Sequence, residues 1–219
     1  MGELLVKELR EDINTNVNVL HNRAFALQIL NECNDLNATE PASSSGKYHP
    51  IADLGYQGLI RHARMVAELV NIMVRCHPLY DQPLDHDVMY LSGLLHDFCK
   101  YQEETEEGIE KKVHTNFDHP IKMANFIRTK TVEYAIENNL KGNELNSFMS
   151  CWQRIALNIS SHMSRWNTSK NSPNIELPLP ETQEQYIIVY ADLVAANSHL
   201  PELMIAMKNT AINFITGRT

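Results

Sequence analysis

Most of the chain repeats its apolar residues at the spacing of an amphipathic helix, and strand-like alternation is scarce. The clearest case lies in residues 54–76, where Leu59, Val66, Leu69 and Met73 form one apolar stripe. Similar spacing predicts further helices over residues 16–33, 85–100, 120–129, 143–163, 181–199 and 201–215. The pattern therefore predicts an all-α fold.

The segments between these helices are polar. Residues 37–50 (NATEPASSSGKYHP) and 167–180 are rich in Asn, Ser and Pro and are predicted to be loops. The acidic stretch 102–112 (QEETEEGIEKK) is most simply a solvated loop, and a lid over a site is the alternative. Because no internal repeat or composition change marks a boundary, residues 1–219 are interpreted as one domain, with residues 1–50 as an N-terminal helical extension and loop.

Two polar residues lie on these apolar faces. His62 interrupts the stripe of residues 54–76, at spacings of three and four from its neighbours. Asp192 has Ile188 four residues before it and Ala195 three residues after it. A buried carboxylate is costly unless it is paired or bound to a metal. Taken singly, His62 could be a satisfied core histidine, and Asp192 could have an Arg or Lys partner.

The stretch LSGLLHDFCKY (residues 91–101) places His96 and Asp97 directly after an apolar run. Adjacent residues of a helix point about 100° apart, yet both side chains can reach one ion placed between their directions. Ser92 and Gly93, four and three residues before His96, are small and would leave room beside its ring. This pair is stronger evidence for a ligand site than a lone histidine.

Two more histidines occur at positions where helices are expected to begin or end. His119 precedes Pro120, and His162 ends a stripe that contains Trp152. Each alone fits a capping or surface role, but a single shared metal site accounts for the whole core-facing set. Four imidazoles and two carboxylates suit Mn²⁺, Fe²⁺, Co²⁺, Ni²⁺ or Zn²⁺. The candidate ligands are His62, His96, Asp97, His119, His162 and Asp192.

Composition indicates which partners and which cellular compartment are expected for the protein. The 27 acidic and 19 basic residues of the 219-residue chain give a net charge of −8, which disfavours a long groove for nucleic acid, although a local basic patch could exist. Four widely spaced cysteines form no CxxC pair and favour a reducing compartment, so a cytoplasmic location is expected. No apolar run is long enough for a membrane span, and no signal core is seen.

The ordered set H…HD…H…H…D resembles the pattern of the HD-domain superfamily of metal-dependent phosphohydrolases. The segments GLIRHARMVAELV, LSGLLHDFCKY, DHPIKMANFI and ISSHMSRW are similar to the HD segment of the YhaM-type 3′–5′ exoribonucleases, over residues 54–199. Ser161–His162 stands where that type has a double histidine, and Phe98–Cys99 stands where it has Ile-Gly. The accessory nucleic-acid-binding domain of that type is not found in this sequence.

This resemblance implies an HD-domain helical bundle and a metal-activated water. The simplest sites of the family hold one ion through the residues that correspond to His62, His96, Asp97 and Asp192. When the two middle histidines are present, the family pattern implies a second ion and Asp97 as the bridge. Two divalent transition-metal ions are therefore the favoured cofactors, and Mg²⁺ is also compatible.

Three basic residues are candidates for substrate binding. Lys100 follows the HD pair by one helical turn, so it is expected to bind a phosphate oxygen or to steady Asp97; a solvated lysine is the simpler alternative. Arg61 and Arg165 each adjoin or nearly adjoin a candidate ligand and are potential phosphate contacts. Trp166 could stack on a base.

The leading functional hypothesis is hydrolysis of a phosphomonoester or phosphodiester in a nucleotide or short oligonucleotide, with Asp97 and Lys100 as catalytic residues. A 3′–5′ exonuclease on single-stranded RNA or DNA is the first alternative. A di-iron oxygenase and a non-catalytic nucleotide-binding sensor are alternatives of other classes. No membrane and no long nucleic acid are expected as partners, and self-association as a homo-oligomer is left open.

Overall fold

The computed structural model describes residues 2–33, 39–43, 49–76, 84–104 and 112–197. Helices dominate these residues, which confirms the all-α prediction. Seven α-helices are found in the described ranges: α1 (Gly2–Asn16), α2 (Leu20–Glu32), α3 (Gly58–Cys76), α4 (His86–Leu95), α5 (His119–Glu137), α6 (Gly142–Ser160) and α7 (Gln183–Ala195). Two short 3₁₀ helices, η2 (Ile51–Asp53) and η3 (Ser164–Trp166), complete the helical elements there. None of the described helices is long and apolar enough to cross a membrane.

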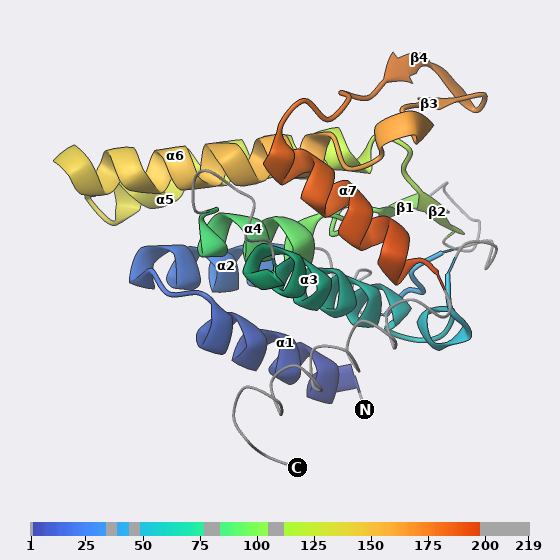
Figure 1. Cartoon of the computed structure of the whole chain (residues 1–219), viewed down its shortest axis with the longest axis horizontal. Helices are drawn as coiled ribbons and strands as arrows, with labels where there is room; N and C mark the ends of the chain where they lie inside the picture. The colour runs from blue at the N-terminus through green and yellow to red at the C-terminus, as the bar shows by residue number, and fades with distance from the viewer. Residues whose placement is uncertain (1, 34–38, 44–48, 77–83, 105–111, 198–219) are drawn as a thin grey trace.

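The helices α3 and α4 form the centre of the bundle. Figure 1 shows them between α1 and α2 on one side and the antiparallel pair of α5 and α6 on the other. Helix α7 crosses this arrangement and contacts α3, α4 and α6. The ends of the five helices α3 to α7 are thereby brought towards the same region, and the candidate ligands come from these ends.

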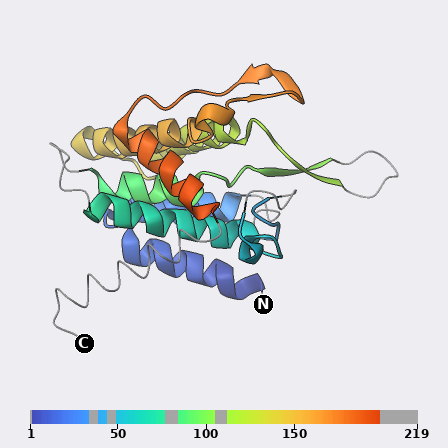
Figure 2. The same ribbon diagram turned by 45° about the vertical axis from the view of Figure 1, so that its right-hand side comes forward.

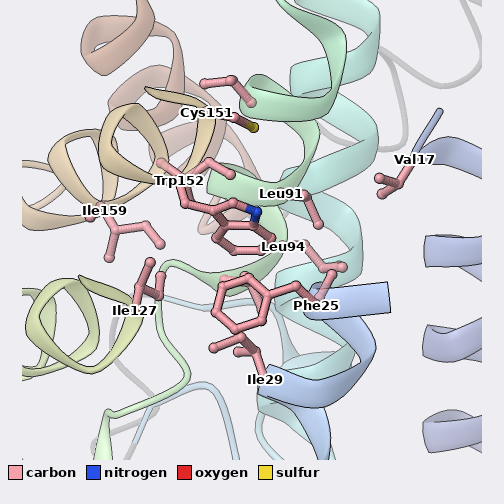
Figure 3. Close-up of a cluster of buried hydrophobic side chains, with 14 of the residues drawn as sticks. Val17, Phe25, Ile29, Leu91, Leu94, Ile127, Cys151, Trp152 and Ile159 are labelled. Atoms are coloured by element: carbon pink, nitrogen blue, oxygen red, sulfur yellow. The ribbon is translucent and has the colours of Figure 1, made fainter. Parts of the chain in front are cut away.

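The main core lies between α2, α4, α5 and α6, as Figure 3 shows. Trp152 is fully buried, and its ring centroid lies 4.5 Å from that of Phe25. Its indole N–H donates to Oδ1 of Asn22, so the polar atom of this large side chain is satisfied. Helices α1 and α2 contribute Ile13, Phe25 and Ile29 to the same core. The N-terminal region therefore packs as part of the bundle.

Two hairpins differ from the sequence prediction. β1 (Tyr101–Glu104) pairs antiparallel with β2 (Lys112–Thr115), and Figure 2 shows this hairpin extending away from the helices. β3 (Thr168–Ser169) pairs with β4 (Ser172–Glu176) in the segment predicted to be a loop. Neither segment alternates apolar and polar residues, so the strand signal that depends on burial of one face is missing.

Several helix boundaries also differ. The sequence prediction starts the first helix at residue 16, where α1 ends, because the mixed charges of residues 2–16 obscure a face that buries Leu9 and Ile13. Helix α5 continues to Glu137, beyond the predicted residue 129, and α4 ends at Leu95 instead of residue 100. The predicted helix 201–215 lies outside the described residues.

Candidate metal centre

The six candidate ligands meet in one place, and each comes from a helix or its end. His62 lies in the second turn of α3, whereas His119 is the first residue of α5. Asp192 is in the last turn of α7, and His162 follows the end of α6 by two residues. His96 and Asp97 complete the set directly after α4. Segments far apart in the sequence therefore supply one site.

The HD pair lies in a turn instead of a helix. The Phe98 amide donates to the Leu95 carbonyl, and the Lys100 amide donates to the Asp97 carbonyl, so the chain tightens after α4. Gly93 was expected to leave room beside the ring of His96, but the space it leaves is next to α3. A Cβ at Gly93 would lie 3.1 Å from Val70 Cγ2 and 3.2 Å from Ala67 Cα. Gly93 makes room for the packing of α4 on α3.

A first group of ligand atoms comes from His62, His96 and Asp192. Oδ1 of Asp192 lies 3.0 Å from Nε2 of His62 and 3.7 Å from Nε2 of His96. One ligand atom from each residue lies within 4.8 Å of the others, a separation that one ion can span. An Arg or Lys partner for Asp192 was the alternative left open by the sequence. The described contacts of its carboxylate are instead with these histidines.

A second group of ligand atoms lies around Asp97, the other carboxylate of the set. Its Oδ1 lies 2.9 Å from Nε2 of His119 and 3.4 Å from Nε2 of His162, and these two nitrogens are 3.3 Å apart. Its Oδ2 lies 3.6 Å from Nε2 of His96. Asp97 therefore stands between the two groups, with one oxygen towards each.

Three of the histidines are oriented by the same local device. Nδ1 of His96, His119 and His162 lies within hydrogen-bond distance of the carbonyl oxygen three residues earlier, at 2.8, 2.7 and 2.8 Å respectively. A carbonyl can only accept, so Nδ1 carries the proton and Nε2 of a neutral ring is left as the metal-binding atom. Backbone contacts of this type fix ring orientation and tautomer in many metal sites.

Burial decides the protonation of His96, and the neighbouring histidines decide that of Asp192. His62 and His96 are completely buried. Burial lowers the pKa of His96 to about 4, although the carboxylates of Asp97 and Asp192 act in the opposite direction. The ring is therefore neutral near pH 7 and able to bind a cation. Burial alone would raise the pKa of Asp192, but the hydrogen bond with His62 and the nearby His96 lower it below its usual range.

The charges around Asp97 lower the pKa of its carboxyl, as the histidines do for Asp192. Burial would raise the pKa of its carboxyl, but Lys100, His96 and the hydrogen bonds with the other two histidines hold that pKa well below the usual range. Burial lowers the pKa of His119, whereas Asp97 outweighs burial at His162 and raises its pKa. Asp97 is thus ionised throughout the physiological range.

The donor set fits divalent cations. Nε2 of His96 is buried without a hydrogen-bond partner among the described residues, which is costly for a polar atom. In the second group, two Nε2 lone pairs and Oδ1 of Asp97 face one another at 2.9–3.4 Å. Such converging acceptors repel each other unless a proton or a cation lies between them. Imidazole and carboxylate are the ligands that borderline divalent metals prefer.

A cavity of about 690 Å³ opens onto these ligands. Asp97, His162 and Asp192 lie on its wall, and the volume is in the range of small-molecule sites. Lys100 also lines this cavity, and its Nζ lies 2.5 Å from Oδ2 of Asp97. Two roles for Lys100 were predicted from the sequence, a contact with a phosphate oxygen and a contact with Asp97. The structure shows the contact with Asp97, and the lysine also lies on the cavity wall.

The two candidate arginines have different surroundings. The Arg61 guanidinium donates to the carbonyl oxygens of Ala52 and Tyr56 at 2.7 and 2.8 Å. Arg61 does not belong to the described residues that line the cavity. Arg165 is exposed, and its guanidinium carbon lies 4.4 Å from the ring centroid of Trp166, which does line the cavity. The structure therefore brings Arg165, but not Arg61, next to the mouth of the site.

Sequence reasoning missed His49 and Asp53. His49 lines the cavity, and its ring centroid lies 4.6 Å from that of His62. Asp53 is buried, with Oδ2 3.9 Å from Nδ1 of His62. His49 lies in an irregular segment before α3, and Asp53 ends the short helix η2, so neither belongs to a periodic face that singles out a polar residue. The high count of ten histidines was the available signal, and it does not locate them.

The fold and the site define a helical protein in which histidine and aspartate side chains that could hold a metal converge from the ends of its helices. The model of the HD domain family matches residues 59–197, a range that includes all six candidate ligands, and the chain belongs to that family. HD domains are generally metal-dependent hydrolases, in a superfamily of metal-dependent phosphohydrolases. No curated protein and no solved structure matches the chain significantly. The likeness to the YhaM type stays a prediction.

Proposed function

We propose that the protein hydrolyses a phosphomonoester or phosphodiester bond in a nucleotide or a short oligonucleotide. The observation that carries this proposal is the position of Asp97. Its two carboxylate oxygens face different groups of imidazoles, and the residue also lies on the wall of the 690 Å³ cavity. A substrate phosphate in that cavity would lie directly beside any ions held there.

The described residues would hold two divalent ions. His62, His96 and Asp192 would bind the first ion, His119 and His162 would bind the second, and Asp97 would be shared. Two such ions, when bound, polarise the phosphoryl oxygens and supply an activated water for in-line attack. Because the pKa values of Asp97 and Asp192 are lowered, both carboxylates are ionised and ready to bind cations without first losing a proton.

Lys100 provides a second source of positive charge. It is largely buried at the cavity wall and is paired with Asp97. Once cations neutralise Asp97, the lysine ammonium can instead donate to a phosphoryl oxygen of the substrate. A charge-assisted contact of this kind favours a phosphate over a neutral group.

The cavity favours a substrate of about the size of a nucleotide. Its volume of about 690 Å³ is adequate for one nucleotide, and Phe117 and Trp166 are among its lining residues. The Trp166 ring is 43% exposed and offers a surface on which a base can stack. The net charge of −8 also disfavours long nucleic acids.

Metal analysis combined with a substrate screen tests this proposal. The protein is loaded with Mn²⁺, Fe²⁺, Co²⁺ or Zn²⁺ and then offered nucleotides, cyclic dinucleotides and short oligonucleotides. We expect about two ions per chain and hydrolysis that Asp97→Asn reduces by a factor of about 10³ or more. Asp118→Asn, at the partly exposed N-cap of α5, is the control and should leave both readouts unchanged. One ion in the fully loaded protein contradicts the binuclear site, and no hydrolysis of any phosphate ester contradicts the function.

The same material separates the other functions. Release of mononucleotides from single-stranded RNA with Mn²⁺ would favour the exonuclease. Oxygen consumption and a mixed-valence iron signal would favour a di-iron oxygenase. Nucleotide binding without turnover, retained in Asp97→Asn, would favour a sensor.

A further inference from the structure

His62 differs from the other three candidate histidines in how its ring is held. Nδ1 of His96, His119 and His162 is bonded to the carbonyl oxygen three residues earlier. Nδ1 of His62 is buried and has no hydrogen-bond partner among the described residues. An unpaired polar atom in a completely buried side chain is unfavourable, so this nitrogen calls for a partner.

The position of His62 in its helix explains the difference. The other three histidines lie at the first residue of a helix or just after its last residue. His62 lies in the second turn of α3, where the Leu59 carbonyl belongs to the hydrogen-bond ladder of the helix. The local device is therefore not free at this position, and a partner for Nδ1 is expected from another segment.

The carboxylate of Asp53 faces this nitrogen. Asp53 is buried, and its Oδ2 lies 3.9 Å from Nδ1 of His62. That separation exceeds the upper limit of about 3.2 Å for an N–H···O hydrogen bond by about 0.7 Å, which a small rotation of the Asp53 side chain can close. The ring of His49 also packs against His62, but both nitrogens of His49 are unpaired as well, so no hydrogen bond joins the two rings.

The backbone around Asp53 is held against the start of α3. The Ala42 amide donates to the Asp53 carbonyl at 2.8 Å. The Arg61 guanidinium donates to the carbonyls of Ala52 and Tyr56, one on each side of Asp53 in the chain. These contacts give the Asp53 carboxylate a defined place beside His62.

Asp53 and Asp192 contact different nitrogens of the same ring. Oδ1 of Asp192 lies 3.0 Å from Nε2 of His62, on the side shared with His96, whereas Asp53 faces Nδ1. The described sets of ligand atoms that lie within 4.8 Å of one another include Asp192 and do not include Asp53. Asp53 is therefore placed behind the ligand, where a carboxylate fixes the tautomer and orientation of a metal-binding histidine.

We propose that Asp53 is the positioning residue of His62. Its carboxylate accepts the Nδ1–H of the ring and thereby leaves the Nε2 lone pair directed towards the ion that His96 and Asp192 would share. The inference rests on the metal centre of the proposed function and is independent of the substrate. It assigns a role to a residue that lies before the range matched by the HD family model.

Zinc binding by the full-length protein tests the inference, with affinity measured by competition with a chelator. Asp53→Ala should weaken the binding of one ion by about 10–100-fold, as the loss of such partners does in other metal sites. Asp53→Asn retains a carbonyl oxygen that can accept the Nδ1–H and should recover part of the affinity.

Nuclear magnetic resonance of the zinc-loaded protein, labelled with ¹⁵N in its histidines, provides a direct signature. Because His62 is completely buried, its Nδ1–H should exchange slowly enough to be observed. The signal is identified by its absence in His62→Gln. It should shift in Asp53→Asn and be shifted or lost in Asp53→Ala, whereas the ring signals of His119 and His162 should stay in place.

Asp87→Asn is the matched control. Asp87 is also a buried carboxylate, but it accepts hydrogen bonds from the backbone amides of Asn18 and Val19. Its replacement should lower the thermal stability without changing the zinc affinity or the His62 signal. This comparison separates a loss of stability from a loss of positioning.

Each result has a distinct meaning. If zinc does not move the His62 signals of the wild type, the metal centre and the role of Asp53 are both contradicted. If zinc binds and Asp53→Ala keeps the wild-type affinity and signal, the role of Asp53 alone is contradicted. An equal loss of affinity in Asp87→Asn would make Asp53 structural and would also overturn the inference. Should Asp53→Ala fail to fold, an unshifted signal in Asp53→Asn overturns it. Absence of hydrolysis bears on the proposed function and leaves these measurements intact.

Discussion

The ammonium group of Lys100 lies 2.5 Å from Oδ2 of Asp97, three residues earlier in the chain. The other carboxylate oxygen, Oδ1, faces His119 and His162. One carboxylate is therefore held from both sides, by a lysine at the cavity and by two imidazoles behind it. The contact keeps Asp97 ionised and places a cationic side chain on the wall of the cavity.

Lys100→Met should reduce phosphate-ester hydrolysis by about 10–100-fold while leaving the metal content unchanged. The lost interaction is a charge-assisted hydrogen bond, for which about 1.5–3 kcal/mol is typical. Lys100→Arg retains the positive charge and should restore part of the activity. Steady-state kinetics with parallel metal analysis measures both effects. A fall in metal content that matches the fall in activity would show instead that Lys100 acts through Asp97.

Substitution of single ligands should change the number of bound ions in a defined way. Asp192→Asn should reduce about two ions per chain to about one, because the group around His119 and His162 keeps all its ligands. His119→Ala should also leave about one ion, on the opposite side of the site. Asp97→Asn should weaken both, since Asp97 faces both groups. Metal analysis after dialysis against a fixed free-metal concentration measures these numbers, and equal losses in all three variants would contradict two separable sites.

The stability of the metal-free protein should fall as the pH is lowered from about 6.5 to 4. The pKa of His96 is about 4 in the folded chain, below the ordinary histidine value of 6.5. Between these values the unfolded chain binds a proton that the folded chain does not, so acid favours unfolding by about 1.4 kcal/mol per pH unit for such a histidine. His119 has a pKa shifted in the same direction.

The other shifted candidate ligands do not oppose this trend within that window, whereas burial raises the pKa of the Asp53 carboxyl, which opposes it. The raised pKa of His162 stabilises the fold fully below 6.5, and this contribution is lost only at higher pH. The lowered pKa values of Asp97 and Asp192 give stability that is lost only below their ordinary value of 3.8. Thermal midpoints of chelator-treated protein measure the trend. His96→Asn should flatten it, and a midpoint that stays constant between pH 6.5 and 4.5 would contradict the assignment.

The cluster of candidate ligands was accessible from sequence because polar residues on apolar helical faces are exceptional. His62 and Asp192 were identified in this way, and both lie at the site. The exact geometry of the HD pair was not accessible, since the apolar pattern continues past Leu95 while the backbone tightens into a turn. His49 lies in an irregular segment, where burial depends on tertiary hydrogen bonds and no periodicity reports it.

The sequence prediction for Arg61 depended on its position beside His62, and adjacent residues on a helix point in different directions. Its bonds to the Ala52 and Tyr56 carbonyls indicate a structural role. Arg61→Met should therefore lower the free energy of unfolding by about 1 kcal/mol and leave the KM for a phosphate ester unchanged. Arg165→Met, beside Trp166 at the cavity, is the matched comparison. A several-fold increase in KM in Arg61→Met would restore the phosphate contact predicted from sequence.

Gly58 provides a direct test of the contact that holds the segment before α3. A Cβ at this position would lie 1.9 Å from the carbonyl oxygen of Asp53 and 2.9 Å from the amide nitrogen of Ala42. Both atoms are backbone, so rotation of a side chain cannot relieve the overlap. Gly58→Ala should therefore displace the segment and lower the free energy of unfolding by about 1–3 kcal/mol, as overpacking does in other buried sites.

Gly55→Ala is the matched control, because the nearest atom to a Cβ there is Nη2 of Arg61 at 3.9 Å, an ordinary contact. Its stability should change by less than about 0.5 kcal/mol. Urea unfolding of both variants and the wild type measures the difference. Since the segment carries Asp53 to His62, Gly58→Ala should also weaken zinc binding, whereas Gly55→Ala should not. Equal stability of the two variants would show that the segment before α3 is not held by this close approach.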